Sequence, residues 1–359
     1  MGCSTALALA KRGIATLVLE RSVPGAEASS AAAGILGAQV ESHADGPMAR
    51  LCVASRALYA DWTSDIQART GIDVGFRACG VLKAALTEAE LGHIESEAAW
   101  QAAAGLAVDR FDGDAARSLE PALTPEAVGA VHFAGDARID PPLLLRALRV
   151  AAERAGARFQ SGAMVRSVAI ESARARGVTL DDGTTLVADS VVIAAGSWSA
   201  LVEGSSLTPG AVRPARGQIV ELQATVPPLR GAVFGPDCYL SPRDDGRVLV
   251  GSTLEFVGFR PGVTAGAVRD LLAAAIRLVP SLADASVGRA WSSFRPYTTD
   301  ELPLLGATPV DRLFLATGHF RNGILLAPIT AVIVTRAILG EPVPEAAAFS
   351  SRRLTMATG

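Results

Sequence analysis

The chain has 359 residues, of which 33 are Lys or Arg and 36 are Asp or Glu, so its formal net charge is −3. At roughly 150 residues per domain, this length predicts about two domains with a sizeable core. Half of the residues are hydrophobic and 19% are charged, a composition that excludes a disordered chain. No basic block is present that could neutralise a run of phosphates, so we expect no nucleic-acid partner.

Neither the cysteines nor the apolar segments indicate a metal site, a membrane span or export. Four cysteines are scattered along the chain: Cys3, Cys52, Cys79 and Cys238. Because they form no C-x-x-C pair, we expect reduced thiols and no metal site. The apolar run 323–335 is shorter than the roughly 18 residues of a membrane span and contains Pro328, so it predicts a buried helix. The N-terminus lacks a secretion signal, and Ala6 stands where a myristoylation motif needs Ser or Thr, so we expect a cytoplasmic protein.

The first twenty residues have the pattern of half a dinucleotide-binding βαβ unit. Small residues at positions 2, 6 and 10 share one face of an expected helix, which ends at Gly13. A buried strand is expected over residues 14–19, and it closes on Glu20. In such units a carboxylate about 20 residues beyond the glycine loop binds the ribose hydroxyls. Glu20 lies 18 residues after Gly2, although a helix, a turn and a strand ending in Glu also occur in many unrelated α/β proteins.

The next segments are expected to contain a loop, several helices and short strands. Residues 24–37 are small, which allows backbone amides to crowd a ligand and equally suits a flexible loop. One long amphipathic helix is expected over 48–68 and another helical pattern over 88–104. Strand-like runs occur within 74–86 and 128–133, and this middle block suggests a second domain. The sequence Asp140-Pro141-Pro142 opens a further helix, which continues to residue 156.

The second half of the chain predicts an antiparallel sheet followed by a return to βα structure. Residues 178–180 and 184–187 flank an Asp-Gly turn, and residues 191–196 form a strand. Strands over 217–222, 239–242 and 247–251 alternate with turns, so their sheet should be antiparallel. A strand over 313–316 precedes a helix over 324–339, which would place Gly323 at a helix N-terminus suited to an anionic ligand.

Several strings in the chain carry a family resemblance. The most specific is GHFRNGILLAP at 318–328, preceded by DELPLLG at 300–306 and by Phe294-Arg295-Pro296. ASSAAAG at 28–34, VIAAGSW at 192–198 and CYLSPR at 238–243 add to it. With these strings in order, the chain resembles the D-amino acid oxidase superfamily of FAD-dependent amine oxidases, and most closely the glycine oxidases of thiamine biosynthesis. The resemblance covers nearly the whole chain.

The resemblance implies a mixed α/β fold, with a Rossmann-like FAD-binding domain and an inserted substrate domain built on an antiparallel sheet. The FAD-binding domain would comprise residues 1–66, 135–205 and 296–359. The substrate-binding domain would comprise residues 67–134 and 206–295. By analogy with the family, the protein would form a homo-oligomer.

The resemblance also assigns substrate and cofactor residues. Arg295 would bind the substrate carboxylate in a bidentate manner, with help from the hydroxyl of Tyr239 and with Arg321 nearby. Without the surrounding strings, Arg295 would suit an ion pair, Tyr239 an interfacial core position, and Arg321 the capping of a loop. The cofactor residues implied are Gly2, Glu20, Arg21, Ser29, Ser30, Ala33, Gly34, Val165, Ala195, Gly196, Trp198, Gly318, His319, Asn322, Gly323 and Ile324. His319 fits a backbone role in a turn better than that of an acid or base.

The implied reaction transfers a hydride from the substrate α-carbon to flavin N5, without a side-chain acid or base, and O2 takes the electrons as H2O2. With glycine as substrate, the imine hydrolyses to glyoxylate and ammonia, or feeds a thiazole synthase. The FAD would be non-covalent, because the segment 296–298 offers no cysteine. The alternatives are a FAD-dependent dehydrogenase or oxidase of D-amino acids or sarcosine, and an inactive truncated flavoprotein.

The family normally begins about ten residues earlier, with a strand and the first two glycines of its loop. The loss of that strand should expose strand edges and remove backbone donors to the pyrophosphate. We expect a start codon placed too late rather than a decayed gene, because every downstream motif is intact.

Overall fold

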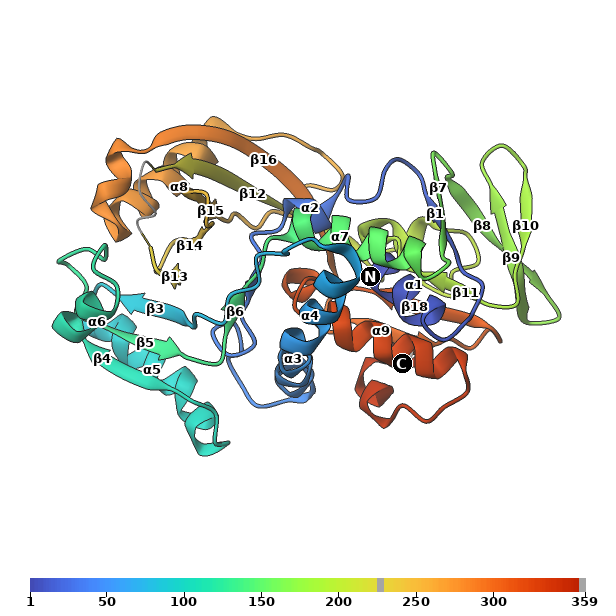
Figure 1. The fold of residues 1–359 in the computed structure, drawn as a ribbon, viewed down its shortest axis with the longest axis horizontal. Helices are drawn as coiled ribbons and strands as arrows, with labels where there is room; N and C mark the ends of the chain where they lie inside the picture. Colours follow the sequence, from blue (N-terminus) through green and yellow to red (C-terminus); the bar gives the residue numbers. More distant parts are fainter. Residues whose placement is uncertain (225–228, 355–359) are drawn as a thin grey trace.

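Two groups of sheets lie at opposite ends of the long axis of the molecule (Figure 1). The computed structural model describes residues 1–224 and 229–354. The helices are α1 Gly2–Ala10, α2 Ala28–Ala31, α3 Pro47–Ala57, α4 Tyr59–Thr70, α5 Glu88–Ala103, α6 Gly113–Leu119, α7 Pro141–Arg154, α8 Ala265–Leu278 and α9 Ala327–Ile338. The first strands are β1 Leu17–Glu20, β2 Ile35–Leu36, β3 Val81–Ala85, β4 Asp109–Asp112, β5 Gly129–Phe133, β6 Ala137–Arg138, β7 Arg158–Ser161, β8 Val165–Glu171 and β9 Arg174–Leu180. The later strands are β10 Thr185–Val187, β11 Val191–Ile193, β12 Arg213–Gln223, β13 Ala232–Phe234, β14 Tyr239–Pro242, β15 Arg247–Gly251, β16 Ser286–Tyr297, β17 Leu304–Ala307 and β18 Leu313–Thr317.

An eight-stranded sheet dominates one end of the molecule, in the order β16-β12-β15-β14-β13-β3-β5-β4. Its neighbours are antiparallel except for β13 and β3, which join its two sequence segments in parallel. The antiparallel sheet predicted for the second half of the chain is therefore confirmed. Helices α5, α6 and α8 pack on the strands of this sheet. The domain boundaries expected from the sequence stay a prediction.

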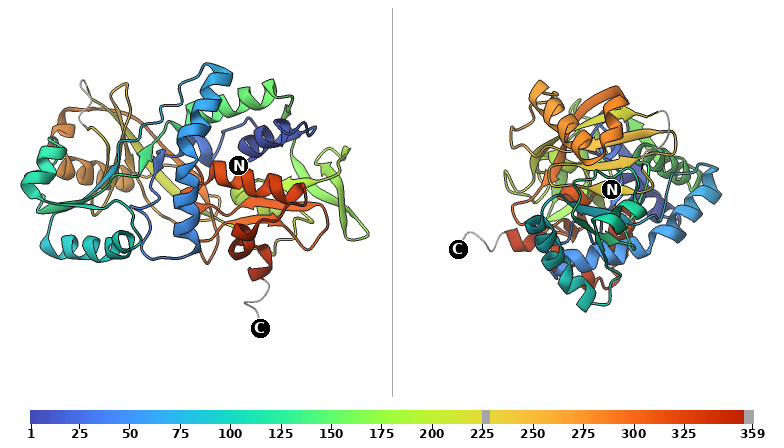
Figure 2. Two further views of the ribbon diagram at one scale, coloured as in Figure 1. Left: turned by 60° about the horizontal axis from the view of Figure 1, so that its bottom comes forward. Right: turned by 90° about the vertical axis from the view of Figure 1, so that its left-hand side faces the viewer.

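Short parallel pairs characterise the other end, where β1 pairs with β7 and β11 pairs with β18. Strand β17 joins β18 in antiparallel fashion, and β8, β9 and β10 form a separate antiparallel sheet. The left view of Figure 2 shows helices α1, α7 and α9 gathered at this end of the molecule. The predicted mixed α/β fold is confirmed.

Strand β1 differs from the buried strand expected over 14–19. It spans Leu17–Glu20, and the Leu17 side chain is 39% exposed. In the described part of the chain, β1 pairs with β7 alone and β11 pairs with β18 alone, so each has one unpaired edge. Both strands line the same cavity. Val191 and Ile193 of β11 are nevertheless buried.

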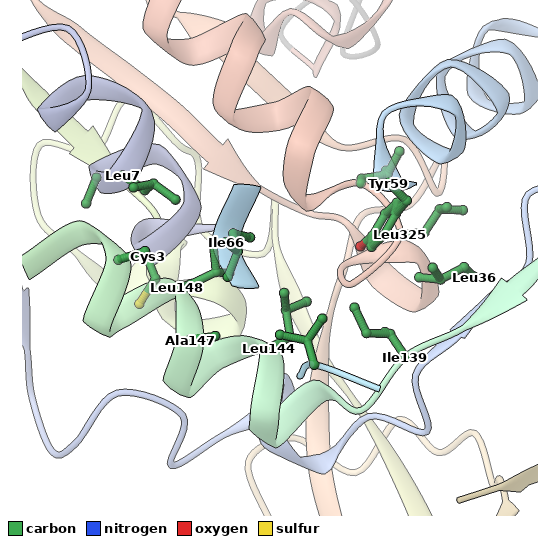
Figure 3. Close-up of a cluster of buried hydrophobic side chains, with 14 of the residues drawn as sticks. Cys3, Leu7, Leu36, Tyr59, Ile66, Ile139, Leu144, Ala147, Leu148 and Leu325 are labelled. Carbon is green, nitrogen blue, oxygen red and sulfur yellow. The ribbon is translucent and has the colours of Figure 1, made fainter. Parts of the chain in front are cut away.

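The core at this end is built where α1 meets α7 (Figure 3). Cys3 and Leu7 of α1 lie near Leu148 and Ala147 of α7, and all four side chains are buried. Ala6, which is 1% exposed, leaves room for the close approach of the helices. Burial of each large side chain here contributes about 1.5–3 kcal/mol. Ala6 and Ala10 of the small-residue face predicted for the first helix therefore belong to the packed core.

Two helix predictions need correction. The single helix expected over 48–68 is two helices, α3 and α4, divided at Leu58. The division turns Tyr59 fully inward, where its hydroxyl donates to the carbonyl of Ile324. The helix expected from Ile324 begins at Ala327, after a 3₁₀ turn over Phe320–Asn322. Pro328 suits this later start, because the first turn of a helix needs no partner for the missing N–H.

No helix among residues 1–224 and 229–354 is both long and apolar enough to cross a membrane.

Candidate functional site

A cavity of about 1450 Å³ lies against both groups of sheets. Its wall includes β1 and β11 from one end of the molecule and residues of β14 and β16 from the other. Pockets for small ligands commonly measure about 300–1,000 Å³, so this cavity has room for a dinucleotide together with a small substrate. Sixteen of the nineteen predicted site residues line it, and Ser30, Gly318 and Asn322 do not.

The first turn of α1 and the end of β1 form one part of the wall. A Cβ at Gly2 would lie 3.9 Å from its nearest neighbour, the Cβ of Ala194, so the backbone here is open to a ligand. The free amides and the positive dipole at the start of α1 suit an anionic group. Glu20 accepts a hydrogen bond from the backbone of Ser22 at 2.9 Å, and its carboxylate borders the cavity. Thr5 also lies on the cavity wall, and its buried hydroxyl has no hydrogen-bond partner among the residues that the structure describes.

Arg21 and Trp198 stack on each other beside this part of the cavity. The guanidinium carbon of Arg21 lies 3.9 Å from the centre of the Trp198 ring. The same ring stacks on Phe259 with centroids 4.9 Å apart. Trp198 belongs to the 3₁₀ turn Gly196–Leu201, which follows β11 and brings Ala195 and Gly196 to the cavity wall. Val165, at the start of β8, completes this side.

The segment 28–34 is held by residues of the eight-stranded sheet. The Ala33 carbonyl accepts hydrogen bonds from Arg243 at 2.6 Å and from the Ser241 hydroxyl at 2.9 Å. Trp291 donates its ring N–H to the Ala31 carbonyl at 3.0 Å. These hydrogen bonds fix the backbone of the segment. Ser29 and Ala33 line the cavity, whereas Ser30 lines a smaller pocket beside α7.

Position 34 requires glycine for two reasons: its backbone conformation, and the lack of space for a side chain. Its φ is +74°, and a Cβ would lie 2.1 Å from the carbonyl oxygen of Ile139. The Gly34 carbonyl in turn accepts a hydrogen bond from Ile139 N at 2.8 Å. Only glycine allows this approach of the cofactor segment to the start of α7.

The segment after β18 places backbone against the cavity. Gly323 and Ile324 line it, and a Cβ at Gly323 would have its nearest neighbour at 3.9 Å. His319 is 2% exposed, and its Nε2 lies 3.0 Å from the Thr330 hydroxyl. Burial lowers the pKa of His319 to about 3, so the ring is neutral at physiological pH. Gly318 packs instead against Thr298, where a Cβ would lie 2.8 Å from the methyl group.

Arg295 and Tyr239 form the opposite part of the cavity wall. Arg295 donates to the Thr253 carbonyl at 3.1 Å and to the Ser252 hydroxyl at 2.6 Å. The Tyr239 hydroxyl interacts with the side chains of Ser252 and Arg295. Burial raises the pKa of Tyr239, which keeps its phenol neutral at neutral pH, and lowers the pKa of Arg295. An arginine guanidinium nevertheless keeps its positive charge in proteins.

Two glycines leave space for the side chains of Arg295 and Tyr239. A Cβ at Gly217 would lie 2.3 Å from Nη1 of Arg295, and a Cβ at Gly251 would lie 2.3 Å from the Tyr239 hydroxyl. Both side chains therefore lie flat across neighbouring strands, β12 and β15. Arg321 also borders the cavity, with its guanidinium 5.1 Å from the centre of the Phe320 ring.

Sequence reasoning missed several residues of this wall. Ser252 and Thr253 hold Arg295, and Glu41 lies on the cavity wall near Arg295 and Arg321. The chain signals Ser252 and Thr253 only by their place directly after a predicted strand. Nothing in the neighbouring sequence singles out Glu41, because its neighbours in the cavity come from distant segments.

A family model described as FAD dependent oxidoreductase, DAO, matches residues 1–337. The chain belongs to this family. The predicted family and its FAD cofactor are thereby confirmed.

Individual relatives are similar over most of the chain. The glycine oxidase of Geobacillus kaustophilus is 38% identical over 338 residues, which cover 93% of this chain and 89% of that protein. Its crystal structure superposes with a TM-score of 0.92 at 35% identity, covering 97% of this chain and 95% of that one. The bifunctional protein ThiO/ThiG of Synechocystis is 38% identical over 358 residues. That match covers 98% of this chain but only 52% of the relative, so this chain spans about half of the relative's length.

The cavity wall fits FAD in its chemistry. The open start of α1 offers amides to the pyrophosphate, and Glu20 offers a carboxylate to the ribose. Gly323 and Ile324 offer uncovered backbone at the end of the cavity nearer Arg321.

Proposed function

We propose that this protein oxidises glycine or a similarly small amino acid, with O2 as the electron acceptor. The observation that carries the proposal is the placement of Arg295 and Tyr239 on the wall of the cavity that also contains the predicted FAD residues. The likeness to glycine oxidases supports the choice of substrate.

The side chains of this protein would bind and orient the substrate. Arg295 is cationic and is held in place by Ser252 and Thr253, so it can form a bidentate pair with the substrate carboxylate. Tyr239 can donate its hydroxyl to the same carboxylate, and Arg321 adds positive charge near it. His319 is neutral and already hydrogen-bonded, which argues against a role as acid or base. Orientation is thus the main contribution expected of the protein.

The cofactor would be held by the backbone at Gly2 and Gly323 and by the carboxylate of Glu20. Bound FAD supplies the acceptor for the hydride that leaves the substrate α-carbon. The substrate amine loses a proton as the C=N bond forms, and water then converts the imine to the oxo acid and ammonia. The two electrons and two protons removed from the substrate end on O2 as H2O2.

A product balance tests this proposal. With glycine in air, glyoxylate, ammonia and H2O2 should form in equal amounts, and one O2 should disappear for each glycine. If glyoxylate forms only when an artificial electron carrier is added, the protein is a dehydrogenase and the oxidase assignment is wrong. If neither H2O2 nor the corresponding oxo acid forms with glycine, sarcosine or D-alanine, the proposed substrate class is wrong.

We further propose that the imine can serve a thiazole synthase. The name of the Synechocystis relative, ThiO/ThiG, pairs two activities in one chain, and this chain aligns with about half of it. We also propose a homo-oligomer, which the family resemblance implies, and a cytoplasmic location, which the sequence led us to expect. Light scattering of the purified protein tests the first of them.

A further inference from the structure

Glu41 is an acidic side chain on the same cavity wall as the predicted substrate residues. It lies beyond β2 in the chain and borders the cavity together with Tyr239, Arg295 and Arg321. The positive charges that act on it most strongly are those of Arg321 and Arg295. No hydrogen bond or close ion pair engages its carboxylate within residues 1–224 and 229–354. The carboxylate is therefore available to a ligand.

The backbone that leads to Glu41 is fixed by a buried acid. The amide of Gln39 donates to the carboxylate of Asp136 at 3.1 Å, and the amide of Val40 donates at 2.9 Å. Asp136 is 0% exposed and pairs with Arg56 at 2.7 Å. The Gln39 side chain is itself hydrogen-bonded to Gln101 and to the Ala107 carbonyl. Since this network determines the direction of the chain at residue 40, the position of Glu41 does not depend on a partner of its own.

A glycine also shapes the space around Glu41. A Cβ at Gly37 would lie 3.4 Å from Cγ of Glu41 and 3.7 Å from its Oε2. The acidic side chain thus lies over Gly37.

An amino acid substrate needs two opposite charges in its site. Arg295 and Tyr239 account for the carboxylate, but they leave the ammonium group without a partner. Both Arg295 and Arg321 would repel this ammonium, and a buried unpaired charge is costly. Glu41 is the acidic side chain whose charge acts on both Tyr239 and Arg295. Asp237 also lines the cavity, but its side chain is exposed to solvent.

We propose that the Glu41 carboxylate binds the ammonium group of the substrate and so selects amino acids over other small carboxylates. This inference rests on the proposed function. It gives Glu41 a part in specificity, whereas Arg295 binds any carboxylate of suitable size. Burial raises the pKa of Glu41, and the arrival of an ammonium would favour its charged form again.

The test compares two ligands of nearly equal size, glycine and glycolate, on the FAD-loaded protein and its Glu41→Gln variant. Glycolate has the carboxylate and lacks the ammonium, and its binding is followed by the change it causes in the flavin absorption spectrum. Glycine binding is obtained from the concentration dependence of anaerobic flavin reduction. The variant should bind glycine about 10- to 100-fold more weakly, as expected for loss of a charged hydrogen bond, and should bind glycolate as tightly as before or more tightly.

Two results would overturn the inference: unchanged glycine binding, or equal weakening of both ligands. If Glu41→Gln fails to fold or to bind FAD, Glu41→Asp takes its place, because it keeps the charge at a shorter reach. Glu41→Asp should still weaken glycine more than glycolate, and an equal effect on both would again contradict the proposal.

Asp237→Asn is the matched comparison, since it neutralises the exposed acid on the same wall. It should change glycine binding less than about threefold, and a larger loss than that of Glu41→Gln would assign the ammonium to Asp237 instead. If the unaltered protein is reduced by no small amino acid, both the proposed function and this inference fail. If it is reduced and Glu41→Gln behaves identically, only the inference about Glu41 fails.

Discussion

The position of the Arg295 side chain depends on the absence of a side chain on the neighbouring strand. Its guanidinium lies across Gly217, where any side chain would meet it at 2.3 Å. Ser252 and Thr253 accept two of its hydrogen bonds, which fixes the plane of the guanidinium. A bidentate contact with a carboxylate depends on this plane.

Arg295→Lys should therefore raise KM for glycine by roughly 100-fold, because lysine keeps the charge but not the fork of donors. Glycolate binding should weaken to a similar extent. Steady-state oxygen consumption and flavin absorption measure the two effects. Arg289→Lys on the same strand is the control, since its side chain is 76% exposed, and it should change neither value. Unaltered KM in Arg295→Lys would remove Arg295 from the substrate site.

His319 provides a prediction about pH and stability. Its pKa is lowered to about 3 in the folded protein, against about 6.5 in an unfolded chain. The unfolded state therefore binds a proton first as the pH falls, so stability present above pH 6.5 is lost between about pH 6.5 and 3, at up to about 1.4 kcal/mol per pH unit.

His319→Gln should reduce this acid sensitivity, because glutamine cannot take up the proton and can still hydrogen-bond to Thr330. Urea unfolding at pH 7.5 and at pH 5 measures the difference for both proteins. The prediction is wrong if the unfolding free energy falls equally in the two proteins over this range.

At the scale of elements, the sequence predicts what is determined locally. The helix opened by Asp140-Pro141-Pro142 is α7, with Asp140 accepting from the backbone of Leu143 as its N-cap. The Asp-Gly turn joins the antiparallel strands β9 and β10 as expected. The division at Leu58 and the late start of α9 were not predicted. Next to these two places Tyr59 donates to the carbonyl of Ile324 across 265 residues of sequence, a contact that no local pattern indicates.

Gly34 and Gly71 allow a matched test of the cofactor segment. Both have φ of +74°, but a Cβ at Gly34 would strike Ile139 while a Cβ at Gly71 would meet nothing within 4 Å. Gly71→Ala should cost about 1 kcal/mol of unfolding free energy, the conformational term alone. Gly34→Ala should cost more than about 3 kcal/mol, or displace the segment and weaken FAD binding. Chemical unfolding and FAD titration distinguish these outcomes, and equal costs would show that the contact with Ile139 is unimportant.

At the scale of the molecule, charged side chains join the eight-stranded sheet to α7. Asp140, at the start of α7, lies 3.4 Å from Arg243 and 3.5 Å from Arg247. Burial lowers the pKa of Arg243 to about 10, so it keeps its charge at neutral pH. The same Arg243 holds the Ala33 carbonyl, so this charged group also positions the cofactor segment.

The whole site was predictable only in part. The strings around Arg295, Arg321 and Tyr239 carried a family resemblance, and the structure brings these three residues to one cavity. Glu41 and Ser252 carry no such signal, because their importance arises from neighbours that folding brings together. Ser30, Gly318 and Asn322 belong to the same strings but do not line the cavity. Ser30 lines the smaller pocket beside α7, and Gly318 packs against Thr298.

The central claim is that this chain binds FAD and passes electrons to it from a small amino acid. The most direct test is the visible spectrum of the protein, recorded without oxygen before and after glycine is added. We predict a flavin spectrum that bleaches on addition of glycine and returns when air is admitted. A protein that remains colourless after incubation with FAD, or a flavin spectrum that no small amino acid bleaches, would contradict the account.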